Sequence, residues 1–438
     1  MAKTNNPRIP VFTHEGATAK HINPEQQLRR SVMACMLWER EFYEDGDSIA
    51  DRIKTLIPQC KPEVVHQIAI DARNKSKLRH VPLLIAREMA RLKECKKLVS
   101  NTLEAIIQRA DELSEFLSLY WIDGKQPLSA QVKKGLARAF TKFDAYQLAK
   151  YNRDNAIKLR DVLFLCHAKP KDKEQEVLWK KLVDGTLEPP DTWEVSLSAT
   201  DGLSKKEKWE RLLKENKLGA MALLRNLRNF INEGVDEKLV IEAFESIRAA
   251  KVLPFRFIAA SKYAPQWEEY IEKAMLKCLS EHEKLPGKTV ILVDVSGSMF
   301  GCKVSKKSEI DRMDAACGVA MMAREICEKV DVVSFSIDAV LVPPRHGFAL
   351  RDAIIQSQHH GSTYLGAAIK NVENSTQGID RIIVITDEQS HDKVPDPKTK
   401  GYMINVASYE NGIGYGAWTH IDGWSESVLD YIKEIESF

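Results

Sequence analysis

The sequence of 438 residues has neither long hydrophobic runs nor closely paired cysteines. No segment approaches the roughly 18 uninterrupted apolar residues of a membrane-spanning helix, and the first residues, MAKTNNPRIPVFTHEG, lack the apolar core of a signal peptide. The eight cysteines are scattered without a C-x-x-C pair, which argues against a disulfide framework or a zinc site. These absences favour a cytoplasmic protein without a membrane partner.

Charge is distributed unevenly, although the formal net charge is only +2. Residues 287–438 hold 15 lysines and arginines against 21 aspartates and glutamates, whereas residues 1–286 hold 49 against 41. A basic front and an acidic back indicate two parts with different functions. The chain length also favours more than one domain.

Helical periodicity extends from about residue 24 to residue 283. Asn23-Pro24 is a helix start, because Asn caps a helix and Pro at the first helical position loses no hydrogen bond. Similar helical stretches follow, joined by short polar or proline-marked turns, and none shows strand alternation. This pattern predicts antiparallel helix pairs stacked as in a HEAT-type solenoid. A compact irregular bundle is the alternative.

Strands and helices alternate after residue 286. Hydrophobic strands are predicted at 289–295, 330–337, 381–387 and 401–408. Helices are predicted at 308–329, capped by Ser308, and at 363–374 and 425–437. This alternation predicts a doubly wound, mostly parallel sheet with right-handed crossovers. The expected fold class is therefore α plus α/β, with an N-terminal extension (1–20), a helical domain (21–285) and an α/β domain (286–438).

Five oxygen-bearing side chains follow the ends of predicted strands or loops. Asp294, Ser296 and Ser298 form D-x-S-x-S, and Thr363 and Asp387 stand at later loop and strand ends. Ligands bind at the carboxyl ends of strands in such sheets, and an all-oxygen set suits a hard cation, Mg²⁺ or Mn²⁺. A polar turn with capping serines is one alternative. A hydrolase is another, although no G-x-S-x-G nucleophile elbow is present and no catalytic residue is predicted.

A second functional region is the basic stretch from residue 131 to residue 171, which holds ten lysines and arginines and only three acidic residues. Lys134, Arg138 and Lys142 repeat every four residues and therefore share one helix face. Tyrosine, phenylalanine and histidine residues are interleaved with the charges. Basic side chains neutralise phosphates and aromatic rings stack on unpaired bases, so RNA binding is predicted. A solvated helix face is the alternative.

The C-terminal part resembles a von Willebrand factor A domain with its metal-ion-dependent adhesion site (MIDAS). The five positions of that motif map to Asp294, Ser296, Ser298, Thr363 and Asp387, each with the expected residue type. In that family the hydroxyls bind the metal directly and the aspartates often bind through water. An acidic group of a partner can complete the shell, which implies ligand binding without turnover.

The order of parts resembles the Ro autoantigen family, whose N-terminal module is the TROVE domain. The segments that carry the resemblance are EGATAKHINPEQQLRRSV, FYEDG, YNRDNAIKLRDVLFLCHAKP, MALLRNLRNF and LPFRFIAA. The resemblance implies a HEAT-like helical ring that accepts single-stranded RNA ends in its hole and a small structured Y RNA on its outer surface. It places Lys150, Arg153 and His167 at the Y RNA surface. Lys133, Lys134 and Arg138 are predicted for the same surface, whereas Asp154 stands where a basic residue is expected.

Together these features predict a non-catalytic, monomeric RNA-binding protein of a small ribonucleoprotein, similar to compact bacterial or phage members of the family. It would bind a Y-like RNA and the single-stranded 3′ ends of misfolded RNAs. RNA quality control or decay would then depend on a partner exoribonuclease of the polynucleotide phosphorylase type. Two rival hypotheses are a metal-dependent protein-binding adhesion scaffold without an RNA role and a metal hydrolase.

Overall fold

The computed structural model divides the chain into two compact units, which we describe separately. The first contains residues 1–22, 34–46 and 201–438, and the second contains residues 23–33 and 47–200. The structure describes residues 10–19, 21–34, 46–75, 78–152, 154–189, 192–199, 202–247, 252, 254–280, 283–301, 303, 310–407, 409, 411–422 and 428–436. The FYEDG motif lies largely outside the described residues.

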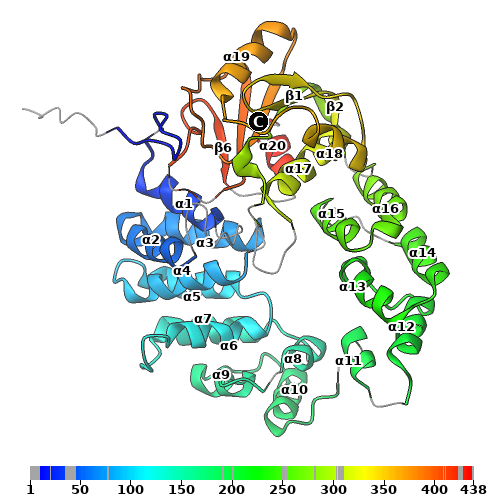
Figure 1. Ribbon diagram of the computed structural model, residues 1–438. Helices are drawn as coiled ribbons and strands as arrows, with labels where there is room; N and C mark the ends of the chain where they lie inside the picture. The colour runs from blue at the N-terminus through cyan, green and yellow to red at the C-terminus, as the bar shows by residue number, and fades with distance from the viewer. Residues whose placement is uncertain are drawn as a thin grey trace, which may run out of the picture. The chain divides into compact units, whose positions relative to one another are not determined.

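The second unit is helical, as the periodicity predicts. Its helices are α1 (Pro24–Ala34), α2 (Gly46–Leu56), α3 (Pro62–Asn74), α4 (His80–Arg91), α5 (Lys96–Ile106), α6 (Asp111–Tyr120), α7 (Ala130–Phe140), α8 (Ala145–Tyr151), α9 (Leu159–Cys166), α10 (Lys173–Asp184) and α11 (Trp193–Ser198). Helices α3, α5, α7 and α9 pack in succession, which fits the predicted stacking of helix pairs (Figure 1). Asn23 caps α1 by accepting a hydrogen bond from the Gln26 amide at 2.8 Å.

The first unit also contains five helices before its α/β domain, among the residues that the structure describes. They are α12 (Lys205–Lys214), α13 (Ala220–Glu233), α14 (Glu237–Ser246), α15 (Pro254–Tyr263) and α16 (Glu268–Ser280). Helices α15 and α16 contact α17, and α16 also contacts α18. Glu272 of α16 accepts a hydrogen bond from the Phe348 amide at 2.6 Å. The boundary predicted at residue 285 therefore separates the α/β domain from two helices that contact it, α15 and α16.

The α/β domain contains a six-stranded sheet with the order β3-β2-β1-β4-β5-β6. Its strands are β1 (Leu285–Asp294), β2 (Cys327–Phe335), β3 (Ala339–Leu341), β4 (Arg381–Thr386), β5 (Lys400–Asn405) and β6 (Thr419–Asp422). All pairs are parallel except β2–β3. The doubly wound sheet is therefore confirmed, because the strand order runs outward in both directions from β1 and β4.

Helices cover both faces of this sheet (Figure 1). They are α17 (Arg312–Ile326), α18 (Gly347–Ile355), α19 (Leu365–Ser375) and α20 (Val428–Glu436). The apolar face of α19 packs on alternate residues of β1, β4 and β5, and α17 contacts β1, β2 and β4. Ser308, the predicted helix cap, lies outside the described residues, and α17 begins at Arg312, after Asp311 accepts the capping hydrogen bond from the Asp314 amide. Among the described residues, no helix has the length and apolar character needed to cross a membrane.

Candidate metal centre and RNA-binding surface

The turn after β1 carries the first three residues of the predicted metal site. Asp294 ends the strand and is fully buried. One of its carboxylate oxygens accepts a hydrogen bond from the Ser296 amide at 2.9 Å, and the other accepts one from the Thr386 hydroxyl at 2.6 Å. These two bonds fix the carboxylate where the central strands β1 and β4 end side by side.

Asp387 follows β4 and joins the same cluster. The Ser298 hydroxyl donates a hydrogen bond to its Oδ2 at 2.5 Å, and the Ser296 and Ser298 hydroxyl oxygens lie 3.2 Å apart. Thr363 is also buried, and the Gly297 amide donates to the Gly361 carbonyl at 3.2 Å. The loop before α19 therefore lies against the serine turn. The parallel sheet thus gathers residues from positions far apart in the sequence, as the strand-end pattern predicts.

The electrostatics of this cluster favour a bound cation. Burial raises the pKa of Asp294 to about 7, and the nearby negative charge of Asp387 adds to the shift. Sequence reasoning missed Arg312, whose fully buried guanidinium donates to the Ser298 carbonyl at 3.0 Å and lies 3.6 Å from Asp387 Oδ2. The single positive charge of Arg312 can balance the negative charge of only one of the two buried carboxylates, Asp294 and Asp387. The carboxylate and hydroxyl oxygens therefore fit a hard divalent ion.

Some basic side chains of the predicted surface are exposed, whereas others bond to α5 or to the residue that follows it. Lys134 is exposed on α7, and His167 is exposed at the end of α9. Arg138 donates to Asn101 and pairs with Glu104 at 3.2 Å, so part of its charge is balanced by α5. Lys142, on the same face, donates to the Ile107 carbonyl at 2.9 Å and thereby caps the end of α5.

The remaining predicted residues lie around α8 and α9. The Lys150 ammonium lies 5.5 Å from the centre of the Tyr146 ring and 3.4 Å from the Tyr146 hydroxyl. Arg153 lies outside the described residues. Asp154, the acidic departure from the expected pattern, pairs with Lys158 at 2.5 Å. The Asp154 side chain is 89% exposed, so water solvates its charge within the basic stretch.

Comparison with known protein families identifies two domain families in this chain. The TROVE domain model matches residues 3–186 and 185–334, and a von Willebrand factor type A domain model matches residues 289–389. The chain belongs to the TROVE family. Membership of this family supports an RNA-binding role in a ribonucleoprotein. The TROVE match extends past residue 285 into the α/β domain, so the predicted domain limits stay predictions.

Two individual relatives extend the comparison. The TROVE chain aligns with the crystal structure of the Deinococcus radiodurans RO (RSR) protein over 93% of this chain and 98% of that chain, with a TM-score of 0.60 and 16% identity. At this identity the likeness shows a shared fold. Mouse telomerase protein component 1 is 30% identical over 112 residues, which are 24% of this chain and 4% of the mouse protein. The chain therefore matches only a small part of that relative.

An N-terminal hairpin of the TROVE chain lies beside the loop that follows Asp387, which the sequence did not predict. Residues 11–19 fold back on themselves through the Phe12–Thr18 bridge. The buried Thr13 hydroxyl donates to the Ser390 carbonyl at 3.1 Å. A carboxylate oxygen of Glu15 lies 3.2 Å from His391 Nε2. The His391 backbone amide donates a hydrogen bond to the Thr363 carbonyl at 2.8 Å. The predicted extension thus contacts the loop that follows Asp387.

A pocket beside the basic surface was also missed. It is lined by two residues of the predicted surface, Lys133 and His167, and by Trp121, which ends α6. Phe164 adds an aromatic ring that is 59% exposed. Its sequence context, VLFLC, is typical of a buried helix, so apolar periodicity alone gave no signal for an exposed aromatic ring.

Proposed function

We propose that this TROVE protein is a non-catalytic RNA-binding component of a small ribonucleoprotein. It binds a Y-like structured RNA on the predicted surface of Lys133, Lys134, Arg138, Lys150, Arg153 and His167, and it captures single-stranded 3′ ends of misfolded RNAs. The family match is the observation that carries the proposal. The exposed basic residues of α7 and α9 support it, because lysine side chains neutralise phosphates without distortion of the fold.

The α/β domain is proposed to bind Mg²⁺ or Mn²⁺ through Asp294, Ser296, Ser298, Thr363 and Asp387. The support is the pair of fully buried carboxylates: Asp387 accepts a hydrogen bond from the Ser298 hydroxyl, and Asp294 accepts one from the Ser296 amide and one from the Thr386 hydroxyl. A bound cation would offset the desolvation that raises the pKa of Asp294. An acidic group of a protein partner could then complete the ion's shell.

The cellular setting follows from the same proposal. A monomeric, cytoplasmic protein of this kind delivers captured RNA to a partner exoribonuclease of the polynucleotide phosphorylase type, so the cleavage chemistry belongs to the partner. The rival hypothesis of an adhesion scaffold places the function in the metal site. The two hypotheses differ in whether RNA is bound at all and in which residues bind the partner.

Paired variants distinguish them. Lys150→Ala combined with Arg153→Ala removes two positive charges from the proposed surface and is expected to lower RNA affinity and the salt dependence of binding. Lys370→Ala combined with Lys393→Ala makes the same charge change on the α/β domain, and Asp294→Ala disables the metal site. Both controls should bind RNA nearly as the wild type does. Loss of RNA binding in Asp294→Ala, with the Lys150/Arg153 variant unaffected, would refute the proposal.

A further inference from the structure

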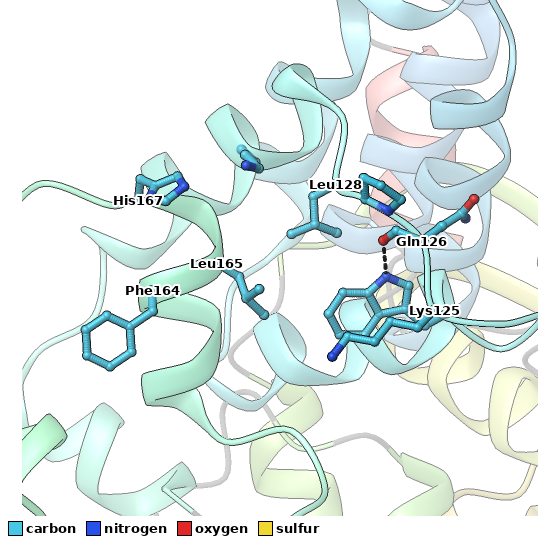
Figure 2. A pocket seen from close by; sticks show the side chains of 9 residues that line it. Lys125, Gln126, Leu128, Phe164, Leu165 and His167 are labelled. Carbon is cyan, nitrogen blue, oxygen red and sulfur yellow. Dashed lines mark hydrogen bonds between the residues drawn. The ribbon is translucent and has the colours of Figure 1, made fainter.

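A cavity of about 510 Å³ opens between the α6–α7 loop and α9. This volume is within the range of roughly 300–1,000 Å³ that is typical of small-molecule sites. Figure 2 shows Leu165 of α9 and Leu128 of the loop pointing toward one another across the gap, with His167 at the rim. All the residues that line it lie in the second unit.

The Trp121 indole forms an aromatic surface in this cavity. Its Nε1 donates a hydrogen bond to the Gln126 carbonyl at 2.7 Å, which fixes the orientation of the ring (Figure 2). The Lys125 ammonium lies 5.3 Å from the centre of the same ring. A half-exposed indole held in this way is a stacking platform with a cation beside it.

The charge around the cavity indicates what it accepts. The described residues that line it include Lys125, Lys133 and His167 and no aspartate or glutamate. An apolar side chain of a protein would fill the leucine-lined part but would leave the two ammonium groups without counter-charge. A nucleotide satisfies both parts, because its base stacks on the aromatic ring while its phosphate pairs with lysine.

We propose that this cavity, here called the Trp121 pocket, holds one unpaired nucleobase of the bound RNA. The base stacks on the Trp121 indole, and Lys125 and Lys133 neutralise the phosphates on either side of it. The inference rests on the proposed function and adds to it. Phosphate contacts of the basic surface are independent of sequence, whereas the Trp121 pocket makes binding depend on an unpaired nucleotide.

The test uses the full-length protein and two RNAs: a stem-loop of about ten base pairs with an unpaired uridine loop, and the blunt duplex of the same stem. Trp121→Ala is expected to weaken binding of the stem-loop by about 5- to 150-fold, as loss of one stacked base predicts, and to leave the duplex unchanged. Trp121→Phe retains a ring and should restore most of the affinity. Lys134→Ala, a charge control outside the pocket, should weaken both RNAs alike.

A second measurement needs no substitution. A stem-loop with 5-iodouridine in its loop is irradiated on the wild-type protein, and the crosslinked peptide is identified by mass spectrometry. A crosslink at Trp121 supports the inference even if the alanine variant fails to fold. Crosslinks confined to other peptides would overturn it.

The outcomes separate this inference from the function on which it rests. If Trp121→Ala binds the stem-loop as the wild type does, the pocket inference is wrong while RNA binding stands. An apolar side chain of a protein partner then becomes the better occupant. If the wild type binds neither RNA at low salt, the proposed function fails and the pocket inference fails with it.

Discussion

Ser298 donates a hydrogen bond to Asp387 across 89 residues of sequence, and the two oxygen atoms lie 2.5 Å apart. The contact joins the turn after β1 to the end of β4. A distance this short is typical of a hydroxyl that bonds an ionised carboxylate. The contact therefore brings together two oxygen-bearing side chains of the proposed metal site.

Metal binding should stabilise the α/β domain. Mg²⁺ or Mn²⁺ is expected to raise the thermal unfolding temperature of the wild type, with a gain of about 2.7 kcal/mol when the ion is at 100 times its dissociation constant. Asp387→Asn removes an anionic ligand and should abolish the increase. Asp338→Asn makes the same change at an exposed position of this domain and should retain it. An undiminished increase in Asp387→Asn would contradict the proposed site.

The N-terminal hairpin should contribute to stability through Thr13. Thr13→Val keeps the shape of the side chain but leaves the buried Ser390 carbonyl without the hydroxyl donor. We expect the free energy of unfolding to fall by about 1–3 kcal/mol in chemical denaturation. Thr18→Val, at an exposed position of the same hairpin, should change it by less than about 0.5 kcal/mol. Equal effects of the two variants would mean that the hairpin does not dock in solution.

Close packing of α5 and α7 requires Gly135. A Cβ atom at this position would lie 2.8 Å from Leu103 Cβ and 3.0 Å from the Ser100 carbonyl oxygen. Gly135→Ala should therefore destabilise the second unit by about 1–3 kcal/mol, despite the higher helix propensity of alanine. Lys134→Ala, on the exposed side of the same helix, is the control for folding. A Gly135→Ala protein as stable as the wild type would show that the two helices can separate without cost.

Acid should weaken the attachment of α20 to the sheet. Burial alone would raise the pKa of Glu436, but hydrogen bonds from Arg381, Tyr402 and Lys400 outweigh it and hold the pKa at about 2. The folded-state pKa is lower than the ordinary value of 4.5, so this stabilisation is present above about pH 4.5 and is lost as the pH falls toward 2. Unfolding temperatures measured across this range should show a smaller decline in Glu436→Gln. Glu245→Gln, an exposed control, should decline as the wild type does.

The sequence was most informative where periodicity and strand ends decide the structure. The closeness of Asp294 and Asp387 was predictable because adjacent parallel strands end at one edge of the sheet. The short strands β3 and β6 were missed, since AVL and THID are too short to show a period. Cys327 was assigned to the preceding helix, although pairing with Leu285 makes it the first residue of β2.

Contacts between distant segments were beyond the reach of sequence patterns. Arg312 is fully buried beside Asp387, yet an arginine at the start of a helix normally predicts an exposed side chain. The docking of Thr13 on Ser390 joins residues 377 positions apart. Lys142 and Arg138 share a face with Lys134, as predicted, but the structure shows that α5 engages the first two. Only packing distinguishes a charge that holds helices together from one that remains exposed.

We propose above that the TROVE chain binds RNA and recognises single-stranded ends. The most direct measurement is a binding titration with a short RNA duplex that carries a single-stranded 3′ tail, at two salt concentrations and without divalent metal. The tail-less duplex and the DNA equivalent are the controls. We expect tail-dependent binding that weakens steeply with salt, because phosphate contacts release counterions. No binding of the tailed RNA by folded protein at low salt would contradict the proposed RNA-binding function and favour the adhesion scaffold.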